Sequence, residues 1–438
     1  MLKNYEVNVQ GAPGQCRAIL GIIVLTMQQI QTLKGFRDYL GADAKKRAWV
    51  ITQMRVVFER FGFEPLETPA LEYEQLLLGK YGTEAEKLVY RFEDNGGRRV
   101  ALRYDQTVPM ARVISSYQNE LVMPYKRYQI QPVWRADKPQ KGRYREFYQC
   151  DADIIGTSSP VADAEILSLY YALYQQLGVT SLVLKVNDRS RLVETIQAQG
   201  VLDDRVMSVI QTIDKLDKLS ESEVVAELVA KGLLEQNAQA LLQALYATEP
   251  SDNLQAIIDT AVTLGVPRDA LQFTPTLARG LDYYTGLIFE GIIPQYPVGS
   301  VGGGGRYDRL LNELSGLDAP AVGFGIGFER TVEALDELGL FPPFDAAARV
   351  VVCYFEETQQ DAQVVVKNLR SAGISTSLYL GSSLKLEKQL KYADKMGAKY
   401  AVIVGETEMQ SQSVIVKDLT QKTQKNVAIS ELARELCS

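Results

Sequence analysis

The sequence of 438 residues contains no histidine. This absence excludes Ser-His-Asp hydrolysis, metalloproteolysis through an H-E-x-x-H helix, and any general-base chemistry that uses an imidazole of the chain itself. Catalysis would have to rest on Arg, Lys, Asp, Glu, Tyr and backbone groups. That inventory suits chemistry performed by positioning and charge stabilisation, of which phosphoryl and adenylyl transfer are the main examples.

The chain is also poor in cysteine, and its cysteines are widely separated. They are Cys16, Cys150, Cys353 and Cys437. No C-x-x-C pair occurs, which argues against a structural zinc site and against a disulfide framework. Such spacing is typical of a reducing compartment, and we therefore expect a cytoplasmic protein.

Positive charge and long apolar runs are limited as well. The net charge is −7 at pH 7, so any contact with nucleic acid requires local basic patches. The apolar run 18–26 is shorter than the roughly 20 residues of a membrane helix, and no signal-peptide cleavage site follows it. We expect no membrane association, and we expect residues 1–26 to be an N-terminal extension, disordered or the product of a misassigned start.

The hydrophobic pattern predicts an α+β fold with several domains, because the chain is too long for one ordinary core. Helical periodicity at 43–61 and 162–177 alternates with strand-like runs such as 125–135 and 146–156. Residues 188–268 are helical throughout, whereas the segment after 349 alternates strands and helices. We expect a core over 27–187 and 269–335, a helical insertion over 188–268, a linker over 336–348, and an α/β domain over 349–438.

A basic segment is the first candidate site. Seven basic residues and one acid, Asp137, lie between Lys126 and Arg145 inclusive. A charge run of this kind is usually a solvated hairpin. However, Arg135 follows an apolar run at the end of a predicted core strand, where burying an arginine is costly without an anionic partner. We favour binding of a phosphate by Arg135.

Two further segments carry polar groups in ordered patterns. Period-two alternation places Gln149, Asp151 and Asp153 on one face of a strand. That face either meets water or lines a cavity, where these side chains would recognise an ammonium or a ring N–H. In 277–290 (LARGLDYYTGLIFE), Arg279 precedes a strand that begins with two tyrosines. The alternative for this segment is an ordinary core strand whose tyrosines reach the solvent.

Glycine gathers at 302–305 and again at 323–327. Neither cluster has the spacing of G-x-G-x-x-G or of G-x-x-x-x-G-K-[ST], so the Rossmann and P-loop interpretations fail. The remaining explanations are a close backbone approach to a flat ligand and tight packing between strands. Arg330 follows the second cluster and can supply a positive charge to a phosphate.

Together these segments resemble a class II aminoacyl-tRNA synthetase of the histidyl type, from about Met27 to the C-terminus. Residues 61–69 resemble motif 1 of that class, which forms the dimer interface, while 134–147 resemble motif 2 and 323–330 (GFGIGFER) resemble motif 3. The histidyl assignment rests on ARGLDYYTG and GGGGRYD, which resemble the two histidine-specific motifs of the family.

The resemblance implies an antiparallel sheet flanked by helices, in a homodimer that binds ATP with Mg²⁺. The implied reaction joins histidine to ATP as histidyl-adenylate, releases pyrophosphate, and then transfers histidine to the 3′ end of tRNA-His. Residues 349–438 would bind the anticodon, with Lys385, Lys388, Lys391, Lys395 and Lys399 as a candidate RNA-binding face, although lysines on a helix are usually just solvated.

The alternative is a non-catalytic paralogue, the regulatory subunit of ATP phosphoribosyltransferase. Such subunits lack the anticodon domain and lose active-site arginines. This chain has the C-terminal domain together with Arg135, Arg279 and Arg330, which favours the ligase.

The resemblance also implies roles for individual residues. The implied catalytic groups are Arg279 and Arg135, and no protein side chain is assigned to a metal. The implied ATP-binding residues are Arg135, Arg143, Arg330 and Gly325. The implied histidine-binding residues are Asp105, Gln106, Thr107, Arg135, Gln149, Asp153, Arg279, Tyr283 and Tyr284. Asp153 and Tyr284 would bind opposite nitrogens of the imidazole, which has one donor and one acceptor. The family often has Glu at the position of Asp153.

Overall fold

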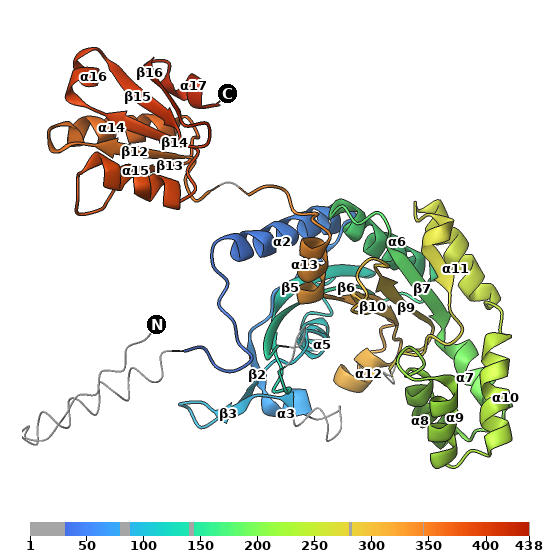
Figure 1. The fold of residues 1–438 in the computed structure, drawn as a ribbon. Coiled ribbons are helices and arrows are strands. Elements are labelled where there is room, and N and C mark those ends of the chain that lie inside the picture. The colour runs from blue at the N-terminus through green and yellow to red at the C-terminus, as the bar shows by residue number, and fades with distance from the viewer. Residues whose placement is uncertain (1–30, 79–87, 140–143, 280–282, 345, 438) are drawn as a thin grey trace, which may run out of the picture. The chain divides into compact units, whose positions relative to one another are not determined.

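The computed structural model describes residues 31–78, 88–139, 144–279, 283–344 and 346–437 (Figure 1). The chain divides into two compact units, residues 1–39 with 46–341 and residues 40–45 with 342–438. The expected N-terminal extension, residues 1–26, lies outside the described residues. Among the residues described, no helix is both long and apolar enough to cross a lipid bilayer.

An eight-stranded sheet is the centre of the first unit, in the order β1-β5-β6-β11-β10-β9-β7-β8. Its strands are β1 (Glu64–Pro65), β5 (Tyr125–Trp134), β6 (Glu146–Ile155), β7 (Val183–Asp188), β8 (Leu271–Phe273), β9 (Leu287–Ile292), β10 (Gly302–Arg306) and β11 (Ala321–Gly327). Neighbouring strands are antiparallel except for the outer pairs β1–β5 and β7–β8. The predicted antiparallel sheet is confirmed, with parallel pairing added at both edges.

Helices cover the sheet and bury its apolar side chains. They are α2 (Ala42–Arg60), α5 (Thr107–Ser116), α6 (Pro160–Gln176), α11 (Asp252–Thr263), α12 (Leu310–Ser315) and α13 (Phe328–Glu337). Residues of α2, α6, α11 and α13 pack with the sheet in one apolar cluster, and α5 and α12 contribute to another. Helix α6 begins at Pro160 because the Ser159 hydroxyl accepts a hydrogen bond from the Val161 amide and proline is favourable in the first turn.

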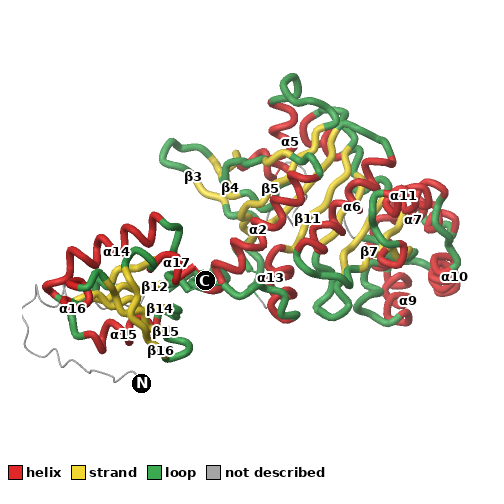
Figure 2. The backbone as a smooth tube through the Cα atoms, turned by 90° about the horizontal axis from the view of Figure 1, so that it is seen from above, coloured by secondary structure: helices red, strands yellow, loops and turns green. Residues whose placement is uncertain are grey.

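The helical segment after β7 has two packing environments. Its helices α7 (Arg189–Ala198), α8 (Asp203–Ile213), α9 (Glu221–Ala230) and α10 (Glu235–Tyr246) share an apolar cluster of their own. The next helix, α11, instead buries Leu254, Ile257 and Ile258 in the cluster of the sheet and lies beside α6 (Figures 1 and 2). A short 3-10 helix, Arg268–Ala270, then leads into β8. The last helix of the predicted insertion therefore packs as part of the core.

A small sheet of order β2-β4-β3 extends from the first unit, with strands β2 (Leu71–Tyr73), β3 (Arg91–Glu93) and β4 (Arg99–Leu102). Helix α3 (Glu74–Leu78) follows β2 directly. In the register, Tyr73 and Phe92 both stand opposite Val100, so these three side chains share one face of the sheet. Tyr73 is 56% and Phe92 45% exposed in the single chain.

The second unit is a five-stranded sheet of order β13-β12-β14-β15-β16 with its own apolar core. Its elements are β12 (Val350–Tyr354), a 3-10 turn (Glu356–Thr358), α14 (Gln359–Ser371), β13 (Thr376–Leu378), α15 (Leu386–Lys395), β14 (Tyr400–Val404), α16 (Glu406–Gln410), β15 (Ser413–Asp418), β16 (Thr423–Ala428) and α17 (Leu432–Cys437). The predicted α/β alternation is confirmed. The edge strand β16 could not be expected from the hydrophobic pattern, because it buries only Val427 and has no apolar alternation.

A buried ion pair ties the end of β10 to the start of α6. The Arg306 Nε donates to both carboxylate oxygens of Asp163 at 2.9 and 3.0 Å, and its Nη1 donates to the Thr157 carbonyl. Both side chains are nearly inaccessible to solvent. Removing the Asp163 carboxylate would leave the buried Arg306 guanidinium with only the more exposed carboxylate of Asp308 as an ionic partner.

We therefore expect Asp163→Asn to lower the free energy of unfolding by about 3–5 kcal/mol. The measurement is urea unfolding of the full chain followed by circular dichroism. The matched control is Asp259→Asn in the exposed pair with Arg268, which should cost less than about 1 kcal/mol. Equal losses in the two variants would contradict a structural role for the buried pair.

Candidate active site

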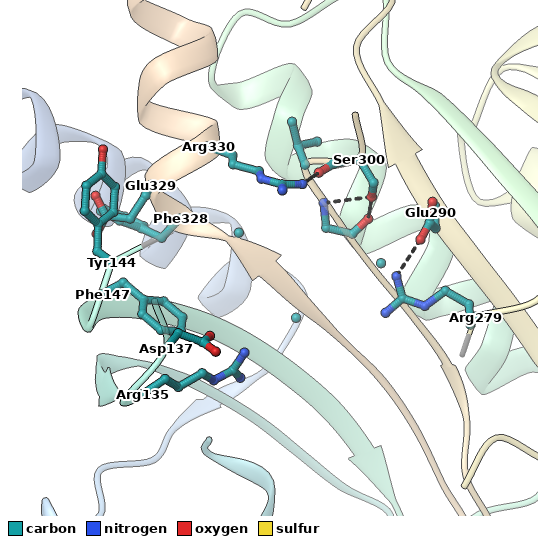
Figure 3. Close-up of a pocket in the computed structure, with 15 residues that line it drawn as sticks. Arg135, Asp137, Tyr144, Phe147, Arg279, Glu290, Ser300, Phe328, Glu329 and Arg330 are labelled. Atoms are coloured by element: carbon teal, nitrogen blue, oxygen red, sulfur yellow. Dashed lines mark hydrogen bonds and ion pairs between the residues drawn. The ribbon is translucent and has the colours of Figure 1, made fainter. Parts of the chain in front are cut away.

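Two adjoining cavities lie over the central strands of the large sheet. The first, here called the arginine cavity, has a volume of about 430 Å³ and is lined by Tyr144, Ser300, Phe328 and Arg330 among others (Figure 3). The second, the carboxylate cavity, has a volume of about 470 Å³ and is lined by Asp105, Asp151, Asp153, Tyr283 and Tyr284 among others. The two cavities share Arg135, Phe147, Arg279, Gly303, Gly325 and Gly327. Shared walls make them neighbouring chambers of one site.

Glycines of β10 allow side chains to pack closely against both faces of the sheet. A Cβ on Gly302 would stand 2.8 Å from the hydroxyl of Tyr170, which lies in the core beneath the sheet. A Cβ on the next residue, Gly303, would stand 3.0 Å from Nη1 of Arg279. Neither space accepts a side chain. Tight packing between strands, one of the two explanations that the sequence left open, is confirmed for both glycines, and close approach to a flat ligand stays a prediction.

Arg135 directly follows β5 and lies where the two cavities meet. Its Nε donates to the Tyr104 carbonyl at 3.0 Å, and its guanidinium lies 5.1 Å from the ring centroid of Phe147. Within the described part of the chain, no carboxylate lies within ion-pair distance of this guanidinium. Arg135 is thus held in place by a backbone carbonyl and an aromatic ring, and its charge remains available to an anion.

Arg279 reaches the same place from the segment before β9. Its φ of 48° is the left-handed conformation, which is uncommon for a residue with a side chain and is found at functional sites. Its Nη1 donates to Oε1 of Glu290 at 2.8 Å (Figure 3). Burial alone would lower the pKa of Arg279, but Tyr284 and Glu290 raise it above its ordinary value. The guanidinium is a fixed positive charge.

Arg330 lies in the first turn of α13 and lines the arginine cavity. Its Nη1 donates to the Ser300 carbonyl at 2.8 Å (Figure 3). The preceding residue, Glu329, accepts hydrogen bonds from Arg37 at 2.9 Å and from Arg47 at 2.5 Å. These contacts fix the start of α13 to the N-terminal segment and to α2, and so fix the position of Arg330.

Asp153 in the carboxylate cavity already has two protein partners. It forms an ion pair with Arg127 of β5, and it accepts a hydrogen bond from the Tyr307 hydroxyl. Arg127 is 1% and Asp153 5% exposed. Burial raises the pKa of Asp153, while the charge of Arg127 opposes that rise. From the sequence, Arg127 is recognised only as one member of a basic run. The GGGGRYD motif contains Tyr307, but the sequence alone predicts no role for that residue.

Asp105 and Thr107 reach the cavity from the start of α5. The Asp105 Oδ1 accepts a hydrogen bond from the Val108 amide at 3.2 Å, while burial raises the pKa of Asp105. Tyr283 and Tyr284 also line the cavity, with ring centroids 4.6 Å apart.

The structure brings most of the sequence-predicted residues together. Those that line the carboxylate cavity are Asp105, Thr107, Gln149, Asp153, Tyr283 and Tyr284, while Arg330 lines the arginine cavity, and Arg135, Arg279 and Gly325 line both. Gln106 lines neither cavity. Its amide nitrogen donates to the backbone carbonyls of Gln131 and Gln149, so this side chain joins α5 to the two long strands. Arg143 lies outside the described residues.

Family models match both units of the chain. The model described as "Histidyl-tRNA synthetase" matches residues 35–331, and that described as "Anticodon binding domain" matches residues 349–437. The chain is 38% identical to the histidine–tRNA ligase of Gloeobacter violaceus, over 92% of this chain and 97% of the relative. It is also 38% identical to the histidine–tRNA ligase of Rhodopirellula baltica, over 92% of this chain and 96% of the relative.

Solved structures agree with these matches. The histidyl-tRNA synthetase from Nostoc sp. PCC 7120 is 28% identical, with a TM-score of 0.81 over 93% of this chain and 99% of that one. A Bacillus halodurans structure named as an ATP phosphoribosyltransferase regulatory subunit/histidyl-tRNA synthetase has a TM-score of 0.71 at 20% identity, over 86% of this chain and 98% of that one, and shares the fold alone. The chain therefore belongs to the histidyl-tRNA synthetase family and is an aminoacyl-tRNA synthetase that acts as a histidine–tRNA ligase.

Proposed function

We propose that histidine is activated where the two cavities meet, with Arg135 and Arg279 as the catalytic groups. The observation that carries this proposal is that both arginines line both cavities. A histidine carboxylate entering from one chamber and an ATP α-phosphate entering from the other would meet between two guanidiniums. As the carboxylate attacks phosphorus and pyrophosphate departs, these fixed charges stabilise the pentacovalent transition state without reorganisation.

ATP would occupy the arginine cavity as its Mg²⁺ complex. Arg330 would pair with the phosphates, Gly325 would form part of the floor beneath the nucleotide, and Arg143 would hold the terminal phosphates. Magnesium keeps several water ligands and binds mainly through substrate phosphates. The described residues contain no group of three or more potential metal-ligating His, Cys, Asp or Glu side chains. In this proposal the ion arrives with the nucleotide, and no protein side chain is assigned to it.

Histidine would occupy the carboxylate cavity. Asp105, Thr107 and Gln149 would bind its α-ammonium, while Asp153 and Tyr284 would bind opposite nitrogens of the imidazole, with Tyr283 beside them. A neutral imidazole has one donor and one acceptor, so a carboxylate and a phenol complement it. An amino acid without these groups would leave buried polar atoms unpaired. A site built in this way can reject such analogues by roughly 10⁴–10⁵.

The second unit would recognise the anticodon of tRNA-His, and the histidyl group would then pass to the 3′ end of that tRNA. Supporting this role, a set of exposed lysines lies on and beside α15: Lys385, Lys388, Lys391, Lys395 and Lys399. Lysines along one helix provide the local positive charge that an acidic protein needs to contact phosphates. We place this reaction in the cytoplasm, as the free thiols Cys150, Cys353 and Cys437 suggest.

We also propose that the enzyme is a homodimer. The support is the exposed apolar face of the small sheet, where Tyr73 and Phe92 flank Val100. Large apolar side chains gathered on one exposed face mark an interaction surface. This sheet follows the segment that resembles motif 1 of the class.

One prediction concerns the positive charge of Arg279, which lies where the two cavities meet. Arg279→Ala should lower kcat for histidine-dependent ATP–pyrophosphate exchange by about 10²–10³, since one preorganised donor to the transition state is lost. The control is Arg268→Ala, an exposed arginine of the same unit, which should keep the wild-type rate. An unchanged kcat in Arg279→Ala would exclude Arg279 as a catalytic group.

The second prediction concerns the imidazole. Tyr284→Phe should raise KM for histidine by about tenfold to a hundredfold, because the hydroxyl partner of one ring nitrogen is removed. The KM for ATP should remain the same, as Tyr284 does not line the arginine cavity. Exchange assays with each substrate varied separately test this. Equal changes in both KM values would contradict the assignment of the carboxylate cavity to histidine.

The third prediction concerns the dimer. Tyr73→Glu combined with Phe92→Glu should shift the chain from dimer to monomer in sedimentation velocity, because charge would be buried in the interface. The matched control is Tyr246→Glu, which changes a tyrosine of similar exposure in the helical segment. A double variant that still sediments as a dimer would place the interface elsewhere.

A further inference from the structure

The carboxylate cavity has more carboxyl groups than arginines that are free of another ion pair. Three carboxyl groups line it, from Asp105, Asp151 and Asp153, together with Arg127, Arg135 and Arg279. Two of these arginines are already committed, because Arg127 pairs with Asp153 and Arg279 pairs with Glu290. Arg135 is the remaining arginine that lines the cavity, and neither Asp105 nor Asp151 lies within ion-pair distance of it among the described residues. Both acids are therefore without a cation in the described part of the chain.

Asp105 accepts a hydrogen bond from the Val108 amide, whereas Asp151 forms no ion pair with any residue that the structure describes. Asp151 lies between Gln149 and Asp153 on the cavity face of β6 and is 5% exposed. Its Oδ1 is buried and receives no hydrogen bond from any group that the structure describes, and the same is true of Oε1 of Gln149. In the adjoining strand Gly325 stands opposite, where a Cβ would lie 3.0 Å from Oδ1 of Asp151. Two neighbouring acceptors therefore face one cavity without donors.

Buried acceptors without donors are costly, and a buried carboxylate without a cation is more so. The substrate assigned to this cavity carries a suitable group, because an α-ammonium is a cation with three N–H donors. We propose that Asp151 is a further histidine-binding residue, whose carboxylate pairs with the substrate α-ammonium beside Gln149. This inference rests on the proposed placement of histidine in the carboxylate cavity, and it assigns the third acid to the amino group.

The state of Asp151 before binding follows from its surroundings. Burial raises the pKa of Asp151 to about 8; Arg127 and Arg135 oppose this rise, and Asp153 and Asp105 add to it. The tyrosines that line the cavity are Tyr104, Tyr283, Tyr284 and Tyr307, and burial raises the pKa of Tyr307 well above its ordinary value. At pH 7 the carboxyl group is therefore mostly protonated in the free enzyme.

Binding of the ammonium favours the charged carboxylate and lowers the pKa of Asp151, so its proton leaves to the buffer. Histidine should then bind more tightly as the pH rises toward 8 and more weakly as it falls, because the proton competes with the ammonium. Between pH 7 and pH 8, KM for histidine should fall about fivefold in the wild type. In Asp151→Asn this fall should be absent, since the amide does not titrate.

The direct test is isothermal titration calorimetry of histidine binding to the full-length protein at pH 7, in buffers of different ionisation enthalpy. The wild type should release about one proton more per histidine bound than Asp151→Asn does. Asp151→Glu, which keeps a carboxyl group, should restore the release. Asp217→Asn changes an exposed carboxylate outside the cavity and should match the wild type.

These experiments distinguish the role of Asp151 from the placement of histidine in the carboxylate cavity. Histidine binding to Asp151→Asn with wild-type proton release would overturn the role of Asp151 and leave the cavity assignment intact. Unchanged histidine binding in Tyr284→Phe would overturn the cavity assignment itself. If Asp151→Asn does not fold or bind, the wild-type KM between pH 7 and pH 8 decides, and a flat profile would contradict the proposal.

Discussion

The register between β6 and β11 is the constraint on which the site depends. Gln149, Asp151 and Asp153 of β6 stand opposite Gly327, Gly325 and Gly323 of β11. Each polar side chain on the cavity face therefore has a neighbour without a Cβ, and the strand beside it leaves the space that a substrate requires. A shift of one residue would turn the carboxyl groups into the core and the apolar residues into the cavity. Strand pairing thus determines the chemistry of the cavity.

The absence of histidine agrees with the chemistry that we propose for this site. The nucleophile in amino-acid activation is a carboxylate, which is already ionised at neutral pH and needs no general base. The demand falls on positive charge at phosphorus, and arginine meets it because its guanidinium does not deprotonate in proteins. Arg135 and Arg279 are held by a carbonyl and by Glu290 respectively, so their positions are set before the substrates arrive.

Much of this arrangement could be predicted from the sequence, because it is encoded locally. Helical periodicity found α2 and α6, and alternation placed three polar residues on one face of β6. What the sequence could not provide is the register in which strands pair and the side-chain contacts that follow from it. Arg127 meets Asp153 only because β5 and β6 pair in one particular register, and Gln106 leaves the cavity because its amide reaches two backbone carbonyls. Similarly, the division between α10 and α11 depends on which apolar cluster each helix joins.

The shorter side chain of Asp153, where the family often has Glu, is compatible with recognition of an imidazole. One carboxylate oxygen pairs with Arg127 and the other accepts the Tyr307 hydroxyl. An ionised carboxylate offers about four acceptor positions, so an N–H donor can still bind. Because both protein partners are buried, they fix the carboxylate in one orientation. The carboxylate of Asp153 is therefore already ordered in the folded protein. A substrate that presents a ring N–H to this carboxylate incurs little further entropic cost.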